Sequence, residues 1–188
     1  AICAAALGLY LGKFIPKKTR YILFKFAIFA ITYLIVALLV NQIMKTIWHR
    51  MRFRDMLKEN DLGHDGFSNF TPWYAPDMSR VELNESYHYS SFPSGHSSSA
   101  VHIFILCTLY KVLPSMRDKK WLKYVIYGGC AAFVLLSMIS RICDDAHYLS
   151  DVIAGASISY IIYKITEYIY FRKSDNFAVA KKALAELE

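Results

Sequence analysis

Residues 140–151 read Ser-Arg-Ile-Cys-Asp-Asp-Ala-His-Tyr-Leu-Ser-Asp, and this polar stretch separates two long apolar segments. If the chain is helical from Ala146 onward, His147 and Asp151 are four residues apart and lie on one face of the helix. A carboxylate in that position can accept a hydrogen bond from one imidazole nitrogen and raise the basicity of the other, which activates a histidine nucleophile or base. Alternatively, Asp151 caps or salt-bridges the first turn of a membrane helix and has no chemical role.

The composition favours a single-domain membrane protein. Of the 188 residues, 55% are hydrophobic, and long apolar runs account for this figure. The formal charge of +7 does not indicate a nucleic-acid partner, because the basic residues lie in short loops between apolar segments, as membrane topology requires. The cysteines are isolated and have no spacing typical of a disulfide framework or a zinc site. They are Cys3, Cys107, Cys130 and Cys143.

The apolar segments predict an all-α fold, a polytopic membrane helical bundle. The segments predicted to cross the membrane are 21–44, 94–113, 124–139 and 152–171. Residues 1–11 are too few to cross about 30 Å of hydrocarbon, so we interpret them as the end of a span that begins before Ala1. A further span before that one would make six, with the first span and part of the second missing from this chain. Gly128 and Gly129 would allow close helix packing.

The expected domain covers residues 1–176, with an interfacial loop at about 46–92 and a cytoplasmic tail at 177–188. Lys and Arg are concentrated in residues 13–20, 114–123 and 172–182, which predicts that these segments are cytoplasmic. Residues 45–92 and 140–151 then share the opposite, extracytoplasmic face.

Two further polar clusters lie on that predicted face. In a helix, Lys45 and Arg52 would point the same way because they are seven residues apart, whereas Arg50 and Arg54 would point elsewhere. This cluster could instead be a basic collar that contacts lipid headgroups.

The other cluster is Phe-Pro-Ser-Gly-His at residues 92–96. Pro can begin a helix without losing a hydrogen bond, and Gly95 allows a close backbone approach. The amides of Ser94, Gly95 and His96 would form an anion site at the helix N-terminus, with His96 beside the anion. The alternative is an ordinary capped helix with an incidental histidine.

Together these clusters offer cationic side chains, a helix N-terminus and two histidines, which suit a phosphoryl group. Its peripheral oxygens need neutralising, its phosphorus needs a nucleophile and its leaving oxygen needs an acid. No motif for a metal or a nucleotide is present, so no cofactor is expected. Asp144 and Asp145 are more typical of a solvated turn than of a metal site.

The clusters resemble, in order and spacing, the three signature motifs of the type 2 phosphatidic acid phosphatase superfamily. Lys45 and Arg52 match the motif Lys, six residues, Arg-Pro, except that Phe53 replaces the proline. Residues 93–96 match Pro-Ser-Gly-His. The motif Ser-Arg, five residues, His, three residues, Asp is matched by Ser140, Arg141, His147 and Asp151.

The resemblance implies a metal-independent membrane lipid phosphatase with a six-helix core. His147 would attack phosphorus and form a phosphohistidine, and Asp151 would orient it. His96 would protonate the leaving group and then activate water. The groups implied to bind phosphate are Lys45, Arg52, Arg141 and the amides near Ser94 and Gly95.

The expected partners are a lipid phosphate and membrane lipid, because the site would lie where lipid headgroups meet water. The family's substrates include undecaprenyl pyrophosphate, phosphatidylglycerophosphate and phosphatidate. In a bacterial cell membrane, an outward-facing site favours recycling of the carrier lipid as a first hypothesis. Four aromatic residues could form an interfacial lid or simply an aromatic belt. They are Phe67, Phe70, Trp73 and Tyr74.

Two other classes of protein are alternatives to a lipid phosphatase. A vanadium-dependent haloperoxidase uses a related anion site, but its relatives are soluble, and the four apolar segments argue against it. A non-catalytic lipid-phosphate binding or transport protein could also place polar residues among spans, although it would not need both His96 and the His147–Asp151 pair.

Overall fold

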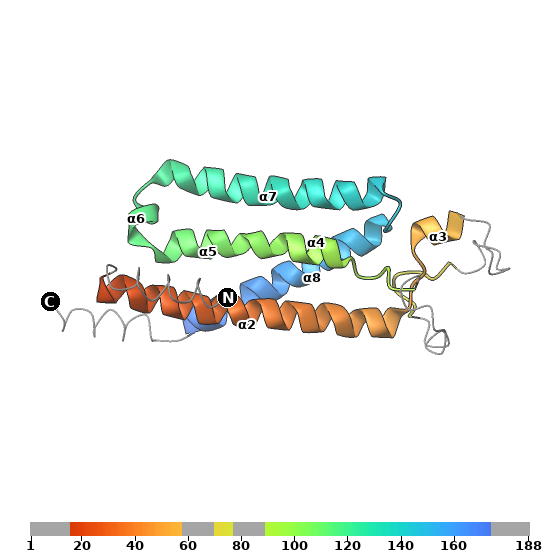
Figure 1. Cartoon of the computed structure of the whole chain (residues 1–188), viewed down its shortest axis with the longest axis horizontal. Helices are drawn as coiled ribbons and strands as arrows, with labels where there is room; N and C mark the ends of the chain where they lie inside the picture. The colour runs from red at the N-terminus through yellow and green to blue at the C-terminus, as the bar shows by residue number, and fades with distance from the viewer. Residues whose placement is uncertain (1–15, 58–69, 77–88, 174–188) are drawn as a thin grey trace, which may run out of the picture.

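The computed structural model describes residues 16–57, 70–76 and 89–173, and these ranges contain helices and no strands (Figure 1). The helices are α2 (Lys17–Trp48), α3 (Phe53–Leu57), α4 (Gly95–Ala100), α5 (Ile105–Val112), α6 (Pro114–Arg117), α7 (Lys120–Cys143) and α8 (Leu149–Tyr168). A 3-10 turn, η3 (Val101–Phe104), joins α4 to α5, and a π-helical turn, η4 (Ile169–Lys173), continues α8. The predicted all-α class is confirmed.

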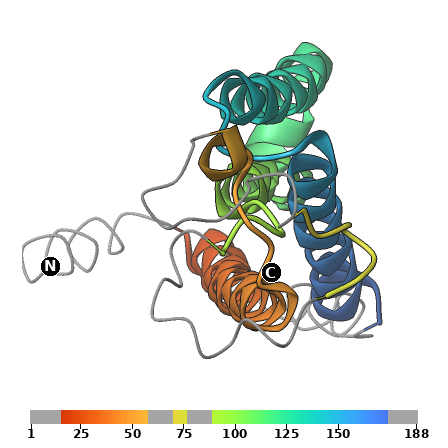
Figure 2. The same cartoon turned by 90° about the vertical axis from the view of Figure 1, so that its right-hand side faces the viewer.

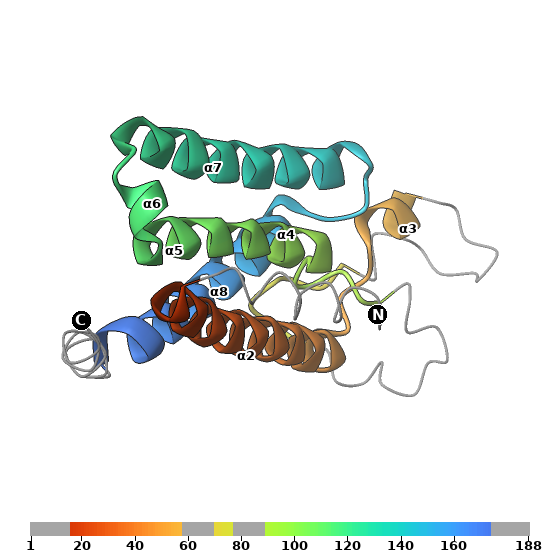
Figure 3. The same cartoon turned by 60° about the vertical axis from the view of Figure 1, so that its left-hand side comes forward.

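The described residues form a bundle of four helical columns. The column α4–η3–α5 lies between α7 and α2, as the end-on view shows (Figure 2). The fourth column, α8, crosses the others obliquely and contacts α2, α4 and α7 (Figure 3). Helix α6 turns the chain between α5 and α7 at one end, and α3 lies at the other end (Figure 1).

The predicted spans correspond to these columns, although each helix has somewhat different ends. Among the described residues, two stretches are long and apolar enough to cross a membrane. They are Thr19–Met56, which contains α2 from Thr19 onward, and Lys120–Cys143, which is α7. The six-span count therefore stays a prediction. The partial span predicted at residues 1–11 and the tail at 177–188 lie outside the described residues.

Aromatic side chains fill the contact between α2 and α8. Phe29, Tyr33 and Tyr163 are almost completely buried. The hydroxyl of Tyr33 lies 2.9 Å from Ser159 Oγ, and that of Tyr163 lies 2.8 Å from Thr108 Oγ1. These buried hydroxyls are therefore hydrogen-bonded, as burial requires. By contrast, the outer faces of α2 and α7 expose large apolar side chains, including Phe24, Ile31, Leu38, Phe133, Leu136 and Ile139.

One glycine, Gly155 on α8, makes the close backbone approach that positions the site. A Cβ at Gly155 would lie 2.3 Å from the carbonyl oxygen of Ser94, just before α4. The close packing predicted for Gly128 and Gly129 is not found in the described part of the chain, since a Cβ at either would meet nothing within 4 Å. The bundle is therefore tightest where α8 crosses the start of α4.

Candidate active site

The first cluster, Lys45 and Arg52, lies at the end of α2. The helix ends at Trp48, and His49 adopts a left-handed backbone conformation with φ 42° and ψ 40°. The prediction that Lys45 and Arg52 share one helical face is therefore wrong. They still reach the same place, because Lys45 Nζ donates to Ser90 O at 2.7 Å and Arg52 Nη2 donates to Ser90 Oγ at 3.3 Å.

The second cluster, residues 92–96, lies at the start of α4 (Gly95–Ala100). Ser94 is the N-cap: its Oγ accepts from the Ser97 N–H at 3.3 Å, and its own N–H donates to Asp151 O at 3.0 Å. Because Ser94 is buried and its amide is already used by α8, the proposed anion site would rely on Gly95 and His96. A Cβ at Gly95 would meet Lys45 Cε at 3.6 Å, an ordinary contact distance. Packing within the protein therefore does not require glycine at this position.

The third cluster spans the end of α7 and the start of α8, with Arg141 in the last turn of α7 and Asp151 in the first turn of α8. Helix α8 begins at Leu149, so the expectation of a helix from Ala146 is wrong, and His147 lies just before the helix. The buried Asp151 carboxylate accepts the Tyr148 N–H at 3.2 Å through Oδ2, which caps the first turn. His147 Nδ1 lies 3.9 Å from the same oxygen, beyond hydrogen-bonding distance.

The three clusters meet at a cavity of about 310 Å³. Its lining residues are Leu38, Asn41, Gln42, Lys45, Arg52, Gly95, His96, Ser98, Ser99 and His147. Ser94 and Asp151 lie behind this lining and are fully buried. Arg141 does not line the cavity, and its Nη2 lies 2.5 Å from Asp144 Oδ2. The structure thus brings both histidines together with two of the three predicted cations.

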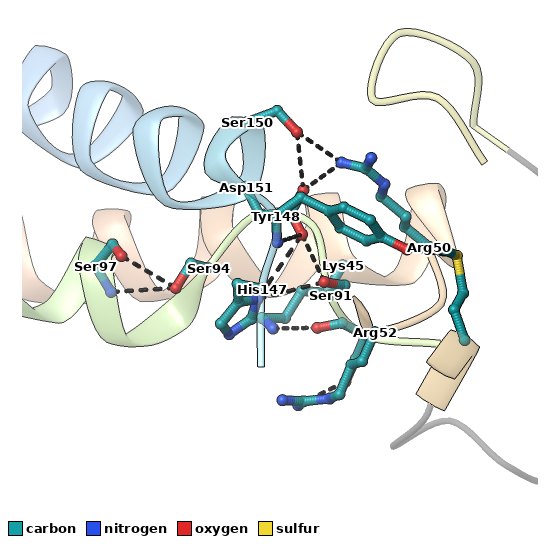
Figure 4. Close-up of polar contacts among 12 residues, drawn as sticks. Lys45, Arg50, Arg52, Ser91, Ser94, Ser97, His147, Tyr148, Ser150 and Asp151 are labelled. Atoms are coloured by element: carbon teal, nitrogen blue, oxygen red, sulfur yellow. Dashed lines mark hydrogen bonds and ion pairs between the residues drawn. The ribbon is translucent and has the colours of Figure 1, made fainter. Parts of the chain in front are cut away.

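Reasoning from the sequence missed two residues that hold Asp151 (Figure 4). Arg50 Nη1 donates to Asp151 Oδ1 at 2.5 Å and to Ser150 Oγ at 2.8 Å. Ser91 Oγ donates to Asp151 Oδ2 at 2.5 Å. Helical spacing directs Arg50 away from Lys45, but it cannot reveal a partner 101 residues later in the chain.

The Arg50 guanidinium is also covered by aromatic rings. It lies 3.9 Å from the centroid of the Tyr148 ring and 5.4 Å from that of Phe70. Burial raises the pKa of Tyr148 to about 12, so this phenol stays neutral beside the ion pair. Arg50 compensates the charge of Asp151, and the cationic side chains of Lys45 and Arg52 line the cavity, where positive charge favours an anion.

The predicted aromatic lid is only partly described. Phe67 lies outside the described residues. Trp73 and Tyr74 are more than half exposed and pack edge to face, with ring centroids 5.8 Å apart. Phe70 packs on Tyr148, with centroids 5.8 Å apart. None of the three described rings lines the cavity, and a lid stays a prediction.

Comparison with known proteins agrees with this geometry. A family model described as the PAP2 superfamily matches residues 26–175. The chain belongs to the PAP2 superfamily. This confirms the resemblance seen in the three motifs, and the matched PAP2 region contains every residue of the cavity.

One curated protein similar to this PAP2 chain is phosphatidylglycerophosphatase B of Bacillus subtilis (strain 168), which is 33% identical over 90 residues. The match covers 47% of this chain and 41% of that protein, so less than half of the relative's length is represented. No solved structure matches the chain. Among the described residues, no group of three or more His, Cys, Asp or Glu side chains could hold a metal ion.

Proposed function

We propose that this PAP2 protein is a lipid phosphatase that works through a phosphohistidine and needs no metal. The observation that carries the proposal is one cavity in which Lys45, Arg52, His96 and His147 converge from three separate segments. Membership of the PAP2 superfamily and similarity to a phosphatidylglycerophosphatase support a phosphate ester as the substrate.

His147 is the proposed nucleophile, and Nε2 is the proposed attacking atom. Nδ1 faces Ser91 Oγ at 3.4 Å and Asp151 Oδ2 at 3.9 Å, which leaves Nε2 to reach phosphorus. As the Nε2–P bond forms, the P–O bond to the lipid breaks, and His96 gives its proton to the departing oxygen. His96 then takes a proton from water, the water oxygen bonds to phosphorus, and the P–Nε2 bond breaks to release phosphate.

Lys45 and Arg52 are proposed to neutralise the peripheral oxygens of the phosphoryl group as negative charge builds up on them. Arg141 would join them by exchanging Asp144 for phosphate. Its ion pair with Asp144 is partly exposed, with 26% and 52% of the two side chains accessible to solvent. Such pairs contribute only about 0–1 kcal/mol, so the larger charge of a phosphate can compete for the guanidinium.

A lipid substrate is favoured by the size and position of the cavity. At about 310 Å³, it is at the small end of ligand pockets, which span roughly 300–1,000 Å³, so it suits a headgroup whose chains stay outside. It lies at one end of a bundle whose outer faces are apolar. We propose an integral membrane protein of a bacterial cell membrane with this end on the extracytoplasmic face, as the distribution of basic residues favours.

Two substrates are preferred for different reasons. The name of the Bacillus subtilis relative supports phosphatidylglycerophosphate. A site on the extracytoplasmic face favours recycling of the carrier lipid, with undecaprenyl pyrophosphate as the substrate. Phosphatidate is the third substrate to test.

The proposed function is tested by phosphate release from the three lipids, using purified protein in detergent with a chelator present. We expect release that survives chelation and is lost in His147→Ala. The matched control is His102→Ala, because His102 packs against Tyr33, with ring centroids 5.3 Å apart, and does not line the cavity. Release that needs a metal would contradict the proposed mechanism. Binding of all three lipids without release would favour a non-catalytic lipid-phosphate binding or transport protein.

A further inference from the structure

Two side chains hold the Asp151 carboxylate, one at each oxygen, in addition to the Tyr148 N–H at Oδ2. Arg50 donates to Oδ1 and Ser91 donates to Oδ2, both at 2.5 Å (Figure 4). All three residues are nearly inaccessible to solvent, with 2%, 0% and 0% exposed for Arg50, Ser91 and Asp151. The Ser91 N–H also donates to Arg50 O at 3.0 Å. The carboxylate is therefore fixed in one orientation by two adjacent segments that are themselves joined.

This arrangement places a hydroxyl between the carboxylate and the histidine. Asp151 Oδ2 is 3.9 Å from His147 Nδ1, whereas Ser91 Oγ is 3.4 Å from that nitrogen. A serine hydroxyl has one proton to donate and two lone pairs that can accept. Its proton is committed to Asp151, because a hydrogen bond to a charged acceptor is the stronger one. A lone pair of Ser91 Oγ therefore remains for an N–H on His147.

We propose that Ser91 is a positioning residue that connects Asp151 to His147. In this relay, His147 Nδ1–H donates to Ser91 Oγ, and the Ser91 hydroxyl proton is donated to Asp151 Oδ2. The relay holds the imidazole as the Nδ1–H tautomer, so the Nε2 lone pair faces the cavity. Its catalytic use rests on the proposed phosphatase function, but the tautomer is a property of the free protein.

The distances suit a relay that tightens during the reaction. At 3.4 Å, the contact between Ser91 Oγ and His147 Nδ1 is longer than most hydrogen bonds, and catalytic hydrogen bonds are often long in the unliganded state. A phosphoryl group on Nε2 would make the ring cationic, and an Nδ1–H on a cationic ring donates a shorter and stronger bond. Positive charge already develops on the ring in the transition state for attack, so Ser91 would stabilise that state more than the free enzyme, which accelerates the reaction.

The test compares Ser91→Ala with Ser159→Ala. Ser159 is a matched control because it is also buried and hydrogen-bonded, but its partner is the Tyr33 hydroxyl at 2.9 Å rather than Asp151 or His147. Both proteins would be labelled with ¹⁵N-histidine, and the ring nitrogens of His147 assigned from their disappearance in His147→Gln. Nitrogen chemical shifts report directly which ring nitrogen carries the proton, a readout that a merely structural role for Ser91 would not move.

We expect the Nδ1–H tautomer in the wild type and in Ser159→Ala, and a shift toward Nε2–H in Ser91→Ala. In phosphate release, Ser91→Ala should lower kcat about 10- to 100-fold with little change in KM, the size of effect seen when a partner that orients a metal-bound histidine is lost. An unchanged tautomer in Ser91→Ala would overturn the relay, as would an equal change in Ser159→Ala.

Two further outcomes separate the relay from the proposed function. A tautomer change in a protein that releases no phosphate would support the relay and reject the phosphatase. If Ser91→Ala does not fold, Ser91→Cys is measured in the same way, because it has similar volume and only a weak hydrogen-bonding group. A wild-type tautomer in Ser91→Cys would overturn the relay, and a shifted one would support it.

Discussion

Substitution of Gly155 by alanine tests how α8 positions the start of α4. A Cβ at this position would lie 2.3 Å from Ser94 O. That oxygen would have to retreat by about 1 Å to reach an ordinary contact distance of 3.4 Å. Ser94 cannot retreat alone, because its N–H donates to Asp151 O at 3.0 Å, and Gly95 and His96 follow it directly in the chain. The substitution should therefore displace one wall of the cavity.

The expected magnitude comes from comparison with Gly128→Ala on α7. Alanine is favoured over glycine inside a helix by about 0.5–1 kcal/mol, and this gain is common to both variants. Gly128 has space for the extra methyl group, since nothing lies within 4 Å of its Cβ position. The difference in unfolding free energy between the variants should then equal the cost of overpacking at Gly155, about 1–3 kcal/mol.

Thermal unfolding in detergent measures the stability difference, and phosphate release measures the effect on the site. A displacement of about 1 Å can reduce catalysis by about 100-fold, so kcat/KM should fall by that factor in Gly155→Ala and stay at the wild-type value in Gly128→Ala. Equal stability and equal activity of the two variants would refute the inference that Gly155 positions the Pro-Ser-Gly-His segment.

Four further predictions concern single residues. Arg50→Gln should lower the free energy of unfolding by about 3–5 kcal/mol, because it leaves the buried charge of Asp151 without its partner; a loss below 1 kcal/mol in thermal unfolding would contradict this. Asp151→Asn should reduce turnover by orders of magnitude while leaving substrate binding largely intact, which kcat and lipid-binding measurements would separate; unchanged turnover would remove Asp151 from the mechanism. Orthovanadate should inhibit phosphate release by occupying the phosphate site, and Lys45→Gln should raise its inhibition constant at least tenfold, whereas an unchanged constant would place the anion elsewhere. Cys143, which is exposed at the end of α7, should react with a membrane-impermeant maleimide in intact cells, as judged against Cys143→Ser. In the Cys143→Ser background, Lys119→Cys at the opposite end should react only after lysis; the reverse pattern would invert the proposed orientation.

The helical columns and five of the cavity residues follow from sequence pattern; these residues are Lys45, Arg52, Gly95, His96 and His147. Apolar runs locate α2 and α7, and the motif spacing selects His96 and His147 along with Lys45 and Arg52. The prediction that Lys45 and Arg52 share one helical face is nevertheless wrong, because α2 ends at Trp48. The sequence has no glycine or proline between Lys45 and Arg52 to mark the end of α2, so a continuous helix was the natural expectation.

The parts that the sequence could not supply are contacts between distant segments. Arg50 and Ser91 hold Asp151 across 101 and 60 residues of chain, and no local pattern identifies them. Gly155 looks like any small residue in a membrane helix until α8 is placed against Ser94. The phosphate-binding role of Arg141 stays a prediction, because its guanidinium is paired with Asp144.

The central claim, a covalent phosphohistidine at His147, is tested most directly by trapping that intermediate. His96→Ala would be mixed briefly with ³²P-labelled undecaprenyl pyrophosphate. The intermediate should still form, because a phosphate leaving group needs little protonation. Its hydrolysis should be slow, because the proposed base is missing. After an alkaline quench, mass spectrometry would locate any phosphoryl group. We predict an acid-labile, base-stable phosphate on His147 that is absent from the His96→Ala, His147→Ala double variant. Wild-type turnover without this adduct, or an adduct on another residue, would contradict the claim.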